Sequence, residues 1–175
     1  MPWSGMSEIR EMKFTDDLPT WAELRHAVEA SDADAPRRWG SMSAPQMLRH
    51  VNAFCGLYMG EIPVSFPIRV AARWLGKFFL NRVARKSPLA TPKNMGTMPA
   101  LRQAPTVHPN WSEELAQFLS YTEQFEAIEV AGNPQKHPMY GEMSARDFSG
   151  LLRHHTAHHF HQFGLLSSAP KRSQS

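Results

Sequence analysis

Histidine is the residue type that stands out in this sequence, because the chain has nine of them and five lie between positions 154 and 161. A helix advances about 100° per residue, so His155 and His159 would lie one turn apart on the same face. Two imidazoles at this spacing can bind one metal ion. We expect His158 at the edge of this face, and His154 and His161 pointing to solvent. The other residues on the face indicate that it is buried: Phe148, Leu151, Leu152, Gln162 and Leu166.

His50 is the third candidate ligand. It lies on the apolar stripe of an earlier predicted helix, together with Met47, Phe54, Leu57 and Tyr58. Burying a polar group without a partner costs about 1–3 kcal/mol, and three protonated imidazoles would also repel one another. A divalent ion removes both costs, and imidazoles suit zinc or nickel. We therefore predict a metal site at His50, His155 and His159 with room left for water or substrate.

Several nearby residues have two interpretations. Gln162 or His158 could orient the rings of the ligands without itself binding the metal. Tyr58 could donate a proton to a developing anion, although tyrosines on such stripes usually pack with their hydroxyl satisfied. Cys55 is about 140° around its helix from His50, so we interpret it as a small core residue. A single core histidine such as His50 is, taken alone, more often structural than a ligand.

The elements that would position these residues are helices. The pattern shows little of the alternation typical of strands, and the apolar spacing predicts an all-α domain. We expect Asp17 to cap the first helix, and Ser43 with Gln46 to form a capping box at the second. The stretch 87–109 contains five prolines, which predicts a long loop that covers the site. The predicted helices span 18–30, 43–60, 67–86, 110–128 and 144–166.

Length and charge favour one soluble domain. We expect an N-terminal segment at 1–13, a helical domain at 14–166 and a flexible tail at 167–175. The net charge of +3 gives no reason to expect nucleic acid or membrane as a partner. A single cysteine and the lack of a signal-peptide pattern predict a cytoplasmic protein. The predicted helix at 67–86 has six basic residues and no acid, so a binding module for anionic partners is a further alternative.

Three separated motifs resemble the DinB-like (DinB/YfiT-like) metalloenzyme superfamily. The segment 155–164, HTAHHFHQFG, is similar to the closing motif of one branch. The segment 38–50, RWGSMSAPQMLRH, resembles the opening of the helix with the first histidine, and 137–144, HPMYGEMS, resembles the lead into the last helix. The chain departs from the pattern at Phe148, where tryptophan is expected, and at Thr156-Ala157, which replaces a bulky and an acidic residue.

The resemblance implies a four-helix bundle, with an additional short helix or long ordered loops. It also implies a zinc or nickel ion on His50, His155 and His159, and a thiol-dependent S-transferase acting on a small molecule with a low-molecular-weight thiol. From the ligands alone the activated nucleophile could equally be water, which would make the protein a metal-dependent hydrolase. A non-catalytic bundle held together by its metal is the other alternative. We also expect exposed apolar edges of the bundle to allow a homodimer.

Overall fold

The computed structural model describes residues 11–94, 101–102 and 107–166, which form an all-α bundle with one small hairpin. The predicted all-α class is confirmed. The tail at 167–175 and most of the N-terminal segment lie outside the described residues. The elements are α1 (Trp21–Glu29), α2 (Ala44–Tyr58), α3 (Phe66–Ala84), the 3-10 helix η1 (Pro88–Ala90), α4 (Trp111–Ala131), β1 (Gln135–His137), β2 (Gly141–Met143) and α5 (Ala145–Gln162).

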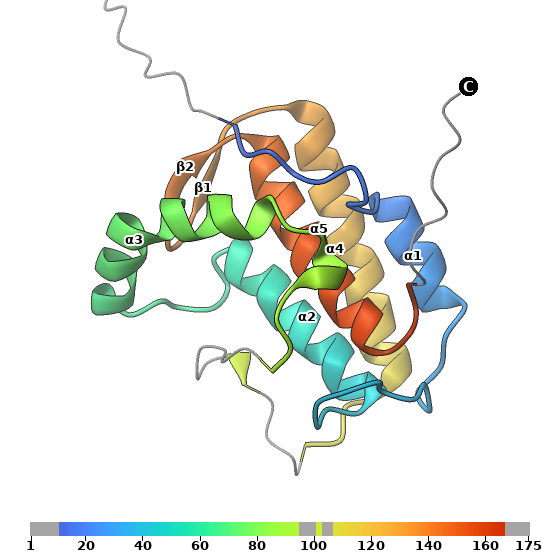
Figure 1. Ribbon diagram of the computed structural model, residues 1–175. Coiled ribbons are helices and arrows are strands. Elements are labelled where there is room, and N and C mark those ends of the chain that lie inside the picture. The colour runs from blue at the N-terminus through green and yellow to red at the C-terminus, as the bar shows by residue number, and fades with distance from the viewer. Residues whose placement is uncertain (1–10, 95–100, 103–106, 167–175) are drawn as a thin grey trace, which may run out of the picture.

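Helices α1, α2, α4 and α5 pack against one another around a single main core. Figure 1 shows α2, α4 and α5 running side by side, with α1 on one side of them and α3 projecting on the other. The centre of the core is built from fully buried side chains on all four helices, including Leu24, Leu48, Phe118, Phe125 and Phe160. This packing places the predicted site helices, α2 and α5, in direct contact.

Local hydrogen bonds explain where the helices begin. Ser43 and Gln46 form the predicted capping box at the start of α2, which is confirmed. The prediction for α1 is wrong, because Thr20 and not Asp17 caps this helix. The Thr20 hydroxyl accepts from the backbone N–H of Glu23, and the Glu23 carboxylate accepts from the backbone N–H of Thr20. Asp17 instead accepts a hydrogen bond from the Ser87 hydroxyl.

The hairpin before α5 was not predicted from the sequence. β1 and β2 are antiparallel, with Gln135 opposite Met143 and His137 opposite Gly141. The ring of His137 stabilises the turn, since its Nδ1 accepts the backbone N–H groups of Met139 at 3.0 Å and Tyr140 at 3.3 Å. Strands of three residues are too short to show the alternation that identifies a strand in a sequence.

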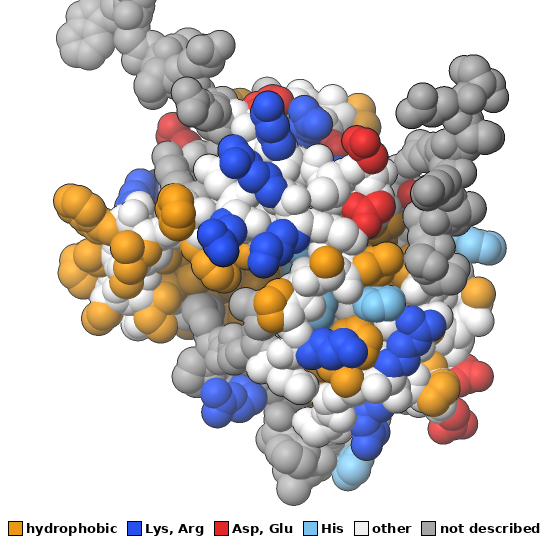
Figure 2. Space-filling model, in the orientation of Figure 1, with side chains coloured by type: hydrophobic (Ala, Val, Ile, Leu, Met, Phe, Trp, Pro, Cys, Tyr) orange, Lys and Arg blue, Asp and Glu red, His pale blue; other side chains and the backbone are white. Residues whose placement is uncertain are grey.

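Helix α3 is unlike the other long helices because most of its apolar side chains are exposed. Gly76, Leu80 and Ala84 face the rest of the molecule, whereas Trp74 is 84% exposed and Phe78 is 78% exposed. Figure 2 shows hydrophobic side chains gathered over this helix. None of the helices in the described part of the chain is long and apolar enough to cross a membrane.

Candidate metal centre

The structure brings together the three histidines singled out from the sequence. His50 comes from the middle of α2, and His155 and His159 come from successive turns of α5. One ring nitrogen from each residue can be chosen so that all three atoms lie within 4.8 Å of one another. The ring centroids are 4.7 Å apart for His50 and His159, and 4.6 Å apart for His155 and His159. These distances allow one ion to contact all three rings, so the residues fit a divalent metal ion.

Hydrogen bonds fix the rings of two candidate ligands. The Nδ1 of His50 lies 2.9 Å from the backbone carbonyl of Leu101, which can only accept, so this nitrogen carries the proton. The Nδ1 of His159 lies 2.9 Å from Oε1 of Gln162, whose amide nitrogen donates to the Trp39 carbonyl. In both rings the proton is on Nδ1, and the lone pair on Nε2 is left for a metal ion.

His155 is held by packing. Its ring stacks on Phe54 with centroids 3.7 Å apart and planes 16° from parallel. Its Nδ1 is buried and has no hydrogen-bond partner among the residues that the structure describes. A buried polar atom without a partner costs about 1–3 kcal/mol, which coordination through that atom would remove.

Burial keeps the three rings neutral, which is the form that binds metal. Desolvation is the main cause that lowers the pKa of His50, of His155 and of His159, the last to about 3. The neighbouring imidazoles lower the pKa of His155 and His159 further, since a second positive charge beside the first is unfavourable. Near pH 7 no proton has to leave these rings before an ion can bind.

The triad lies on the wall of a large cavity of about 1020 Å³. Residues from α2, α3, α5, the hairpin and the proline-rich loop line it. Pro92 and Leu101 contribute from the loop, so the described part of the predicted lid does border the site. A cavity beside the three histidines leaves space for a substrate, which catalytic metal sites need and closed structural metal sites lack.

The other predicted residues lie at different places around this cavity. Gln162 contacts His159 directly, as described above. His158 lines the cavity, and its ring lies 5.2 Å from the ring of His159, measured between centroids. Tyr58 also lines the cavity, and burial raises the pKa of its hydroxyl. The functional role of each residue stays a prediction.

The prediction that His154 points to solvent is wrong. His154 is only 3% exposed, and its Nε2 donates to the backbone carbonyl of Lys86 at 2.9 Å. The end of α3 and η1 cover this side of α5, which helical periodicity could not reveal. His161 is half-buried and contacts Arg38 at 3.3 Å.

Cys55 is fully buried in the core, as predicted. Burial raises the pKa of its thiol and so disfavours the thiolate, which is the form that binds metals and acts as a nucleophile.

Sequence reasoning missed the carbonyl of Leu101, which orients His50, and the position of Arg102 from the loop on the cavity wall. Leu101 lies 51 residues from His50 and belongs to no periodic segment, so no sequence signal indicated the contact. The basic residues of α3 were visible as a charge pattern, but their position beside the triad depends on how the helix packs.

A family model described as "Protein of unknown function (DUF1569)" matches residues 6–164. The chain belongs to this family. The DUF1569 match covers the three histidines and all of the helices described above. Neither the curated proteins nor the solved structures contain a match to the chain.

Proposed function

We propose that this protein is a metal-dependent enzyme of the DinB-like type, in which His50, His155 and His159 hold a zinc or nickel ion. The observation that carries the proposal is the convergence of three neutral imidazoles, with nitrogens within 4.8 Å of one another, on the wall of a large cavity. When bound, a divalent ion lowers the pKa of a thiol or water and so supplies a nucleophile near neutral pH.

The chain's own residues would have separate tasks in this enzyme. Leu101 and Gln162 hold the rings of His50 and His159 so that their free nitrogens face the ion. Phe54 holds the ring of His155 by stacking. Tyr58 lies on the cavity wall, and its raised pKa means that it would act as a hydrogen-bond donor in its neutral form.

The reaction we favour is S-transfer from a low-molecular-weight thiol to a small electrophile. In this step the sulfur forms a bond to carbon, the leaving group departs with its electron pair, and the thiol proton passes to solvent. A thiol substrate also fits our proposal of a cytoplasmic location, because that compartment keeps thiols reduced.

Metal content tests the ligand assignment. We expect about one zinc or nickel ion per chain in the wild type, and much less in His50→Ala, His155→Ala and His159→Ala. His161→Ala on the same helix is the matched control, since His161 is outside the triad. Circular dichroism checks that each variant folds. Stoichiometric metal in all three triad variants would defeat the assignment.

Activity tests separate the reaction classes. The metal-loaded protein is incubated with cysteine or glutathione and a small alkylating electrophile, and with an activated ester without thiol. Turnover that needs the thiol and is lost in His155→Ala supports transfer, whereas ester cleavage without thiol would support a hydrolase. Tight metal binding without turnover of either kind would support the non-catalytic bundle and contradict the enzyme.

A further inference from the structure

The charged side chains that line the cavity all have the same sign. Arg82 and Lys86 come from the end of α3 and the residues just after it, and Arg102 comes from the loop. Among the residues that the structure describes, none of those lining the cavity is Asp or Glu. A cavity with cations and no acid attracts an anion and repels a cation.

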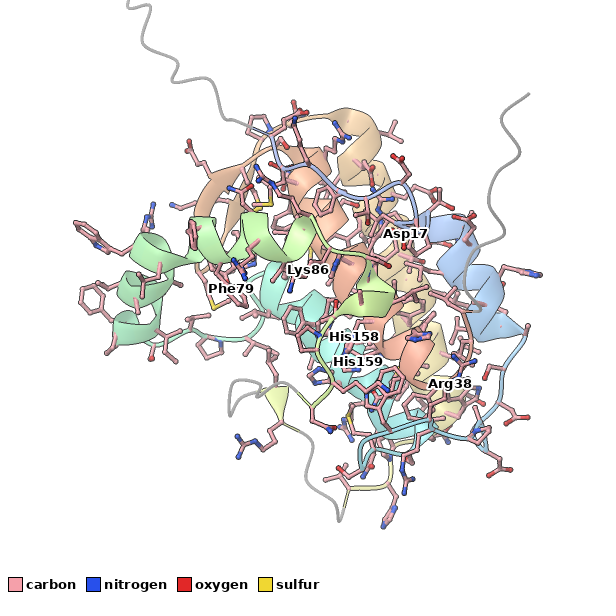
Figure 3. The ribbon with its side chains drawn as sticks, viewed as in Figure 1. Asp17, Arg38, Phe79, Lys86, His158 and His159 are labelled. Atoms are coloured by element: carbon pink, nitrogen blue, oxygen red, sulfur yellow. The ribbon has the colours of Figure 1, made fainter. Side chains whose placement is uncertain are left out.

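Two of these cations, Arg102 and Lys86, lie at or next to residues whose backbone carbonyls accept hydrogen bonds from histidines of α2 and α5. The carbonyl of Leu101 accepts from His50, and Arg102 is the next residue along the chain. The carbonyl of Lys86 accepts from His154, which directly precedes His155 on α5. Figure 3 labels Phe79 and Lys86 together with His158 and His159 of α5, and all four residues line the cavity. Arg82, Lys86 and Arg102 therefore place positive charge on the walls of the same cavity that holds the triad.

Apart from Arg82, the side chains that α3 contributes to the cavity wall are apolar. Ile68, Leu75 and Phe79 line the cavity from this helix, together with Ala71, Ala72 and Leu80. The cavity, at about 1020 Å³, is at the upper end of the size range of small-molecule sites. It has room for an extended apolar group along α3 as well as a polar group near the triad.

We infer that the cavity binds an amphiphilic anion, with its apolar chain along α3 and a carboxylate or thiolate head near His50, His155 and His159. This inference deepens the proposed function and rests on it for the charge of the metal ion. Three neutral imidazoles leave both positive charges of a divalent ion uncompensated, so an anionic head is favoured over a neutral one.

Calorimetry with three probes of equal chain length tests the inference on the zinc-loaded protein. The probes are octanoate, octan-1-ol and octylammonium. We expect octanoate to bind about tenfold more tightly than octan-1-ol, and octylammonium to bind most weakly. Equal affinity for octanoate and octan-1-ol would overturn the inference.

Charge variants show whether the named cations are responsible. In Arg82→Gln/Lys86→Gln, the affinity for octanoate should fall about threefold to tenfold while that for octan-1-ol stays unchanged. Arg85→Gln is the matched control, because Arg85 is exposed at the end of the same helix and does not line the cavity. An equal loss in the control would contradict the assignment, since it would indicate a general effect of net charge.

The metal-free protein separates this inference from the proposed function. If octanoate binding weakens on zinc removal but still depends on Arg82 and Lys86, the result supports both the metal site of the proposed function and the anionic amphiphile as ligand. If the protein binds no zinc and octanoate binding nevertheless depends on these cations, the proposed function fails and the anionic amphiphile stands. Zinc binding without any preference for octanoate would leave the metal assignment intact and overturn the ligand class.

Discussion

Gln162 connects one candidate ligand to a distant part of the backbone. Its Oε1 accepts from His159 and its amide donates to the Trp39 carbonyl, so the side chain cannot rotate without losing two hydrogen bonds. Removing the polar partner of a ligating imidazole typically lowers metal affinity by about tenfold to a hundredfold. We therefore expect Gln162 to position the ring of His159 without itself binding an ion.

We predict that Gln162→Leu weakens zinc binding by about tenfold to a hundredfold, because the ring of His159 loses its orientation. Competition against a chelator of known affinity measures the effect. Gln124→Leu is the control, since Gln124 is exposed on α4 and does not line the cavity. The same zinc affinity in both variants would contradict a positioning role.

The triad could be predicted from the sequence because helical periodicity is a local property. Spacing of four residues on an apolar stripe identified His155 and His159, and the same reasoning applied to α2 identified His50. The positions of Leu101, Arg102 and Lys86 depend on how the long loop and the surface helix α3 pack against the bundle. Their contacts follow from tertiary packing, which no pattern in the sequence specifies.

At the scale of elements, Gly76 sets how closely α3 approaches the hairpin. A Cβ atom at this position would lie 2.4 Å from ring carbons of Tyr140. Tyr140 and Gly76 both line the cavity, so this contact also fixes one of its walls. The five predicted helices correspond to α1 to α5, and the capping box of α2 was also predicted, but the contact between Gly76 and Tyr140 could not be predicted from sequence patterns.

We predict that Gly76→Ala destabilises the protein by about 1–3 kcal/mol, because α3 or Tyr140 must move to relieve the clash. This cost exceeds the gain of about 1 kcal/mol that alanine brings inside a helix. Urea unfolding gives the change in free energy. Gly60→Ala is the comparison for backbone strain alone. A Cβ atom at Gly60 would have no other atom within 4 Å, but its φ of +79° is unfavourable for alanine. A more stable Gly76→Ala would contradict the close packing.

At the scale of the whole molecule, buried neutral histidines make stability depend on pH. Burial lowers the pKa of His50, His154, His155 and His158, and lowers that of His137 and His159 to about 3. In the unfolded chain each ring titrates near its ordinary value of about 6.5. Below that pH the unfolded state binds more protons than the folded state, so acid favours unfolding.

We predict that the metal-free protein keeps its full stability above about pH 6.5 and loses it as the pH falls towards about 3. Each such ring contributes up to about 1.4 kcal/mol per pH unit within this window. Urea midpoints measured with a chelator at about pH 7.5 and about pH 5 check this expectation. Equal midpoints would show that the rings are not buried in neutral form.

The exposed side chains of α3 should contribute little to folding. We predict that Trp74→Ser changes the free energy of unfolding by less than about 0.5 kcal/mol, because this side chain is 84% exposed. Leu152→Ala, in the fully buried core of α5, should cost about 2–5 kcal/mol. Thermal unfolding compares the two variants. A large loss in Trp74→Ser would mean that α3 packs against the bundle differently.

The burial of Cys55 has a practical consequence for work with thiol substrates. The chain has this one cysteine, and its sulfur is enclosed in the core with a raised pKa. Reagents that count free thiols should therefore give no background signal from the folded protein. A cysteine introduced on the outer face of α3 would be the sole site for attaching a spectroscopic label, without first removing the native residue.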